Sequence, residues 1–145
     1  MPDVNEGNEI TASADSRRRV WWHLMEWGAN IGCHQMPERS FFFRGYQFPV
    51  CARCTGVLLS TPPAMAVFFL HRMSIALSLG LSSIMLLDWS LQYFGIREST
   101  NPRRLVTGFI GGFGVTMLHM YFYYGIYLGV VAFVKMVCNF FGTSA

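Results

Sequence analysis

Residues 74–95, SIALSLGLSSIMLLDWSLQYFG, contain a single charged side chain, Asp88. A helix needs about 20 predominantly apolar residues to cross the hydrocarbon core of a bilayer. The stretch therefore predicts a membrane-spanning helix with one ionisable group inside it. Because an ionisable group is costly at that depth, Asp88 is a candidate functional residue that needs a partner.

Two further apolar stretches, residues 52–71 and 105–141, are also long enough to cross a bilayer. We therefore predict an all-α integral membrane protein, a helical bundle with three transmembrane helices. The last stretch exceeds one crossing by a wide margin. Four spans, with a tight turn near Gly125 or Gly129, are the alternative.

The overall composition agrees with a membrane protein. Hydrophobic residues make up 52% of the chain and charged residues 13%, against roughly 25% charged in an average soluble protein. The net charge is +3, and the arginines are clustered. Such clusters suit anionic lipid headgroups or a phosphorylated ligand. No long basic face is present, which argues against nucleic acid as a partner.

The N-terminal region divides into two parts. Residues 1–16 hold almost no large apolar side chain, which predicts a mobile tail. Residues 17–32 begin with three arginines and predict an amphipathic helix that lies in the membrane interface. Its apolar residues recur with helical spacing: Val20, Trp21, Leu24 and Trp27. Residues 17–145 are predicted to form a single membrane domain.

Three spans place the loop at 33–51 and the loop at 96–104 on the same side of the membrane. Most of the arginines lie in or before these two loops. Because arginine and lysine favour the cytoplasmic side, both loops are predicted to be cytoplasmic, on a plasma or inner membrane.

Cysteines at a short spacing predict a metal site. Cys51 and Cys54 form a CxxC motif, Cys33 offers a third sulfur, and His34 or the upstream His23 offers a nitrogen. The reducing cytoplasm disfavours a disulfide. Thiolate and imidazole ligands favour zinc over an iron–sulfur or copper site. A closed shell of four ligands would be structural, whereas an open position could activate a water.

The arginine-rich loops predict an anion site. Guanidinium groups bind phosphate in bidentate fashion. The sequence STNP before a predicted helix also leaves backbone amides free to bind an anion. The candidate residues are Arg39, Arg44, Arg97, Ser99, Asn101, Arg103 and Arg104. Arginines that simply reach toward lipid headgroups are the alternative.

Polar residues inside the predicted spans form a third group, Asp88, Gln92 and His119. Asp88 and Gln92 are one helical turn apart and share a face. Arg103 or Arg104 is the predicted partner of Asp88, which is either an acid–base catalyst or one half of a structural ion pair. His119 is predicted to hydrogen-bond to a neighbouring helix.

Local signals predict details of the helices. Pro62 and Pro63 each remove a backbone donor and predict a kink or local unwinding. Gly108 and Gly112 have the GxxxG spacing that permits close helix packing. Cys138, far along the chain, is predicted to be an ordinary buried thiol.

The blocks CHQMPERSFFFRGYQFPVCARCTG (33–56) and RESTNPRRLVTG (97–108) resemble a family of small prokaryotic membrane proteins known as the domain of unknown function 2085 family. The resemblance covers about residues 30 to 115 and implies a small multi-span membrane protein. It implies no established activity. The matching positions of the first block are Cys33, His34, Gln35, Pro37, Arg39, Ser40, Gly45, Cys51, Cys54, Thr55 and Gly56. Those of the second region are Asp88, Gln92, Arg97, Ser99, Asn101, Arg103 or Arg104, and Gly108.

Together these observations predict a small integral membrane protein with a structural zinc site beside an arginine-rich, anion-binding loop. The alternative is a membrane enzyme or transporter that acts on a phosphorylated or anionic lipid at the cytoplasmic interface.

Overall fold

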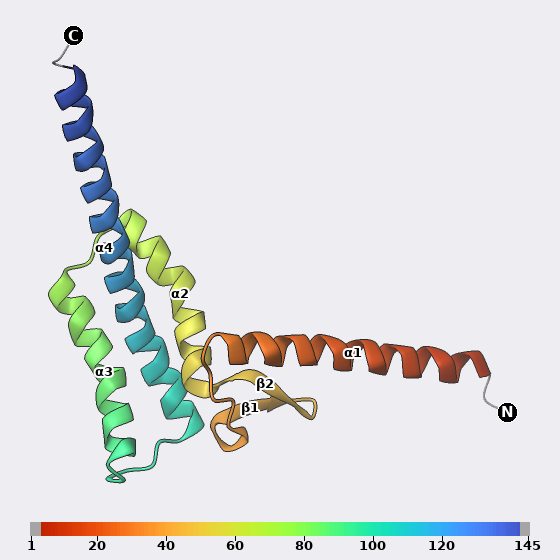
Figure 1. Cartoon of the computed structure of the whole chain (residues 1–145). Helices are drawn as coiled ribbons and strands as arrows, with labels where there is room; N and C mark the ends of the chain where they lie inside the picture. Colours follow the sequence, from red (N-terminus) through yellow and green to blue (C-terminus); the bar gives the residue numbers. More distant parts are fainter. Residues whose placement is uncertain (1–3, 143–145) are drawn as a thin grey trace.

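A computed structural model describes residues 4–142, which form four α-helices, one short 3-10 helix and a two-stranded hairpin (Figure 1). In chain order the elements are α1 (Val4–Asn30), η1 (Pro37–Arg39), β1 (Ser40–Phe43), β2 (Tyr46–Cys51), α2 (Ala52–Leu70), α3 (Ile75–Tyr93) and α4 (Asn101–Gly142).

Helices α2, α3 and α4 are each long and apolar enough to cross a membrane, which confirms the three predicted spans. Their outward faces carry exposed large apolar side chains, such as Leu59, Leu70 and Leu87, which are 57%, 86% and 63% exposed. An apolar exterior of this kind fits lipid rather than water.

The long C-terminal stretch is one continuous helix, so the alternative of four spans is wrong. At 42 residues α4 is about 63 Å long, twice the roughly 30 Å of a bilayer's hydrocarbon core. Its C-terminal half extends beyond the ends of α2 and α3 (Figure 1).

Glycines allow α4 to lie directly against both other spans. A Cβ added at Gly108 would collide with the backbone oxygen of Arg53 on α2, and one added at Gly111 would collide with Met85 on α3. A Cβ added at Gly112 would likewise lie 2.7 Å from Ser60 Oγ and from Val57 Cα of α2. The predicted close packing at the GxxxG motif is therefore confirmed.

The sequence predicts a kink or local unwinding at Pro62 and Pro63. Helix α2 is continuous from Ala52 to Leu70, so the chain does not unwind there, and the kink stays a prediction. Side chains on one face of this helix, Ser60, Ala64 and Phe68, are buried. Packing of this face maintains the helix where backbone donors are missing.

Helix α1 begins at Val4, before the predicted start at residue 17. Residues 4–16 are thus helical rather than a tail, while residues 1–3 lie outside the described range. Asp15 pairs with Arg18 and Arg19 at 3.9 and 3.5 Å, and such pairs one turn apart extend a helix across the expected boundary.

The remainder of α1 matches the predicted helix and runs away from the bundle, across the direction of the spans (Figure 1). Trp21 faces the hairpin, and its indole nitrogen donates to the Gln47 carbonyl at 2.8 Å. Val20, Leu24 and Trp27 are 57%, 46% and 46% exposed. These exposed apolar side chains suit the membrane interface, and that location stays a prediction.

The segment predicted as a loop, residues 33–51, contains the hairpin that the sequence did not suggest. Arg44 and Gly45 form its turn with φ values of 50° and 82°, as a type I′ turn requires. At the open end of the hairpin Ser40 pairs with Cys51. The hairpin therefore returns the chain to the start of α2.

Candidate metal centre

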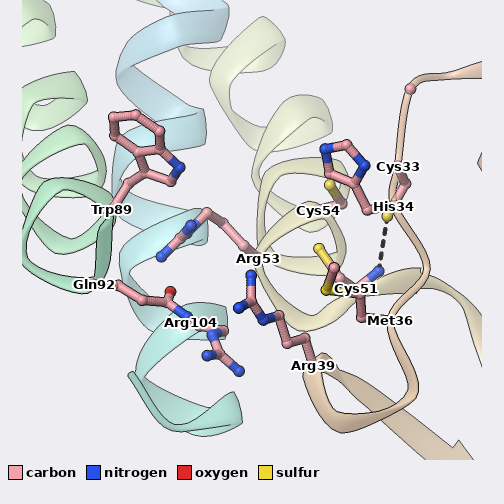
Figure 2. A pocket seen from close by; sticks show the side chains of 11 residues that line it. Cys33, His34, Met36, Arg39, Cys51, Arg53, Cys54, Trp89, Gln92 and Arg104 are labelled. Carbon is pink, nitrogen blue, oxygen red and sulfur yellow. Dashed lines mark hydrogen bonds between the residues drawn. The ribbon is translucent and has the colours of Figure 1, made fainter. Parts of the chain in front are cut away.

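Three cysteine sulfurs meet where the hairpin joins α2. Cys33 follows α1, Cys51 ends β2, and Cys54 lies in the first turn of α2. Their Sγ atoms all lie within 4.8 Å of one another (Figure 2). The backbone amide of Cys51 donates to Cys33 Sγ at 3.2 Å, which orients that sulfur.

The sulfur spacing fits a tetrahedral metal ion. A zinc ion with Zn–S bonds of about 2.3 Å holds two sulfurs roughly 3.8 Å apart. The three sulfurs therefore need only small shifts to share one ion. Thiolates are soft ligands that suit zinc.

The protonation chemistry also supports ligation. A hydrogen bond from the Cys54 side chain lowers the pKa of Cys51 to about 5. This hydrogen bond favours the deprotonated form of Cys51, and the thiolate is the form that binds metals. All four cysteines are unpaired thiols in this structure.

Neither predicted histidine belongs to the group of ligand atoms, which in the described range consists of the three sulfurs. His34 lines the pocket beside them, and Figure 2 shows it in the same view. His23 is instead on the exposed surface of α1, where it lies 3.9 Å from Glu26. His34 is therefore the better placed of the two candidates for a fourth ligand.

Asp88 forms a buried ion-pair network next to the sulfurs. Asp88 is 3% exposed. Its Oδ2 lies 2.6 Å from Arg53 Nη2, and its Oδ1 lies 2.7 Å from Arg103 Nε. The hydroxyls of Ser99 and Thr107 also donate to this carboxylate, at 3.2 and 3.3 Å. These contacts occupy both oxygens and favour a structural ion pair over acid–base chemistry.

The partners of Asp88 differ in part from those predicted. Arg103 is found as expected, whereas Arg104 donates to Asn101 Oδ1 at 3.0 Å instead. Arg53 is an additional partner that the sequence analysis missed. One feature of the sequence indicated it: Arg53 is the one charged residue of the CxxC motif, which lies at the start of a predicted span.

A pocket of about 200 Å³ separates the sulfurs from α3 and α4. The cysteines form one side, and three guanidinium groups from different elements face it in Figure 2. These belong to Arg39 of η1, Arg53 of α2 and Arg104 of α4. Trp89 and the predicted polar residue Gln92 bound the pocket on the α3 side.

Four of the predicted anion-binding residues line an adjoining pocket of about 620 Å³: Arg39, Ser99, Asn101 and Arg104. Exposed Glu38 and Glu98 line the same pocket. The amide nitrogen of Asn101 donates to the Ser40 carbonyl at 3.3 Å. The two loops predicted to share one side of the bundle therefore lie in contact.

The remaining predicted anion residues lie elsewhere. Arg103 is engaged with Asp88, and Arg97 is exposed outside both pockets. Arg44 is at the hairpin tip with its guanidinium carbon 5.4 Å from the ring centre of Phe43. The turn conformation of Arg44 places it at the end of the hairpin opposite to Cys51, so Arg44 does not belong with the other candidates.

Two other predicted positions lie apart from the site. His119 Nδ1 donates to the Val115 carbonyl of its own helix at 2.9 Å, so the predicted bond to a neighbouring helix is wrong. Cys138, predicted to be buried, is exposed near the end of α4. This part of α4 extends beyond the ends of α2 and α3, so neither of these spans covers its apolar surface (Figure 1).

Comparison with known proteins places the motifs in one family. A family model described as predicted membrane protein (DUF2085) matches residues 33–118. An uncharacterized protein of Methanothermobacter thermautotrophicus is 37% identical over 95 residues, which cover 59% of this chain and 82% of that protein. An uncharacterized protein of Methanocaldococcus jannaschii is 39% identical over 95 residues, which cover 57% of this chain and 58% of that protein. No solved structure matches.

Proposed function

This chain belongs to the DUF2085 family of predicted membrane proteins, and from that premise we propose that it is a zinc-binding membrane protein. The observation that carries the proposal is the convergence of three sulfurs from separate elements to within 4.8 Å. Cys33, Cys51 and Cys54 bind the ion directly.

The zinc ion has a structural role in this proposal. One ion bonded to all three sulfurs cross-links the end of α1, the end of β2 and the first turn of α2. Metal binding at such sites contributes directly to the free energy of folding. The ion thereby fixes α1 and the hairpin against the membrane-spanning bundle.

His34 supplies the fourth ligand in this account, through a rotation of its exposed side chain. Three thiolates and one imidazole make a closed shell, which is typical of structural zinc. Hydrolytic chemistry would need an open position for water and a free acid–base group. Both oxygens of Asp88 are already held by arginines, which supports the structural role.

We also propose that the metal centre faces the cytoplasm. This end of the bundle contains Arg39, the arginines of α1 and those of the α3–α4 connection. Arginine favours the cytoplasmic side, where the reducing environment also keeps the thiols available for metal.

Metal analysis of the protein purified in detergent tests the proposal. We expect one zinc per chain in the wild type and almost none in Cys33→Ser, Cys51→Ser or Cys54→Ser. Cys138→Ser is the matched control, because this thiol is exposed on α4 and lies outside the cluster. Equal zinc in the wild type and Cys51→Ser would exclude the proposed site.

A further inference from the structure

We infer that the pocket beside the metal centre binds the phosphate group of an anionic lipid, with Arg39 and Arg104 as the direct ligands of the anion. This ligand site is distinct from the zinc ligands. It combines two arginines without counter-ions in the described structure, two hydrogen-bond donors on the α3 side, and an adjoining apolar groove.

Arg104 is a buried cation without a counter-ion among the described residues. It is 8% exposed, and its Nε is buried without a hydrogen-bond partner in the described part of the chain. Its Nη1 donates to the neutral Asn101 side chain at 3.0 Å. Because burying an uncompensated charge is costly, the position favours a bound anion.

Arg39 provides a second cation on the same pocket. Within residues 15–142 its guanidinium group has neither a salt bridge nor a side-chain hydrogen bond, and Figure 2 shows it among the pocket-lining arginines. Arg53 also lines the pocket, but its charge is matched by Asp88 at 2.6 Å. A proposed zinc centre with three thiolates and a neutral imidazole carries one negative charge, which is too little to match both remaining arginines.

Two other side chains of the pocket, on the α3 side, can donate hydrogen bonds. The Gln92 amide and the Trp89 indole N–H both line it, and neither has a side-chain hydrogen-bond partner within the described region. The pocket lining contains no carboxylate, and its one negative charge is that of the proposed zinc centre. Because phosphate oxygens are acceptors that guanidinium groups bind in bidentate fashion, this chemistry selects a phosphate-type oxyanion.

Two glutamates near the pocket indicate which of the two adjoining pockets binds the anion. Glu38 and Glu98 line the larger adjoining pocket, and both side chains are exposed. Their negative charge disfavours an anion there. The phosphate group therefore belongs in the inner pocket of about 200 Å³, between the sulfurs and Arg104.

An apolar groove favours a lipid as the source of the phosphate. Arg53 and Trp89 line both the inner pocket and a groove of about 420 Å³ between the spans. The rest of the groove is mainly apolar and includes Leu79, Met85, Leu86 and Val115. A charged end joined to an apolar channel matches the headgroup and acyl chain of a phospholipid.

Binding measurements with the full-length, zinc-loaded protein in an uncharged detergent test the inference. Dioleoyl phosphatidic acid, dioleoyl phosphatidylcholine and inorganic phosphate are titrated separately, and binding is followed by thermophoresis. We expect phosphatidic acid to bind most tightly. Loss of one charge-assisted contact in Arg39→Gln should weaken its binding about tenfold.

Matched variants separate a built site from general surface charge. Arg44→Gln and Arg97→Gln each remove one arginine outside the pocket, and both should bind phosphatidic acid like the wild type. Because Arg104 is buried, the binding measurement uses a variant of Arg39, which is exposed. The zinc content of each variant is measured on the same sample, so loss of lipid binding with zinc retained is independent of the metal proposal.

Three results would overturn the inference. Absence of phosphatidic acid binding would exclude the site. An equal loss in Arg44→Gln would assign binding to non-specific charge. Inorganic phosphate that binds as tightly as phosphatidic acid, through Arg39, would show a site for a soluble oxyanion rather than a lipid.

Discussion

The carboxylate of Asp88 on α3 lies 2.6 Å from Nη2 of Arg53 on α2. Its second oxygen lies 2.7 Å from Arg103 on α4, so one buried side chain joins all three spans. Arg53 lies between Cys51 and Cys54 in sequence. The ion pair therefore fixes the first turn of α2 relative to the rest of the bundle. Cys54 lies in this turn, and Cys51 directly precedes it.

Neutralising this carboxylate should destabilise the protein. Asp88→Asn leaves Arg53 and Arg103 without a counter-ion, and removal of one partner from a buried pair costs about 3 kcal/mol. Thermal unfolding in detergent measures the loss. Glu98→Gln is the control, because Glu98 is exposed at the same end of the bundle; equal stability of the two variants would contradict the role assigned to Asp88.

Glycine substitutions test the contact between α4 and α2. Gly108→Ala places a Cβ against the Arg53 backbone and should lower the free energy of unfolding by about 2 kcal/mol. Gly125→Ala meets nothing within 4 Å and should be neutral, or stabilising by up to about 1 kcal/mol through helix propensity. The reverse order of stabilities would refute the observed packing of the two helices.

The histidine that completes the metal centre can be identified by a matched pair of variants. His34→Ala should weaken zinc binding at least about tenfold in competition with a chelating dye, because a ligand is lost. His23→Ala should bind zinc like the wild type, since His23 lies on the exposed face of α1. Unchanged affinity in His34→Ala would remove this residue from the proposed shell.

Thiol labelling tests the orientation in the membrane. In a zinc-loaded Cys138→Ser background, whose other three thiols are the proposed zinc ligands, Arg44→Cys and Arg97→Cys should each increase labelling by a membrane-impermeant reagent added from the cytoplasmic side. Arg72→Cys, in the turn between α2 and α3, should react only from the opposite side. Labelling of Arg97→Cys and Arg72→Cys from the same side would refute the three-span topology.

The spans could be predicted from sequence because their signal is local. A run of about 20 apolar residues specifies a membrane helix without knowledge of its neighbours. The approach of the two loops followed from the number of spans, and the contact between Asn101 and Ser40 bears it out. Arg103 followed in turn as a partner for Asp88.

The features that the sequence analysis missed depend on tertiary contacts. Strands β1 and β2 are 4 and 6 residues long, and their turn of Arg44 and Gly45 is a weak signal beside an Asn-Gly turn. Arg53 is hard to recognise as a partner of Asp88, because the two residues lie 35 positions apart in sequence. A local pattern does not predict the hairpin, and it does not show which residue pairs with Arg53.

Cys33, Cys51 and Cys54 are proposed to share one metal ion. Native mass spectrometry of the intact protein, released from detergent in the gas phase, tests this proposal most directly. We expect a mass raised by one zinc ion less the protons it displaces, and this increment should be absent in Cys54→Ser. An apoprotein mass two hydrogens lower, as a Cys51–Cys54 disulfide would give, would contradict it.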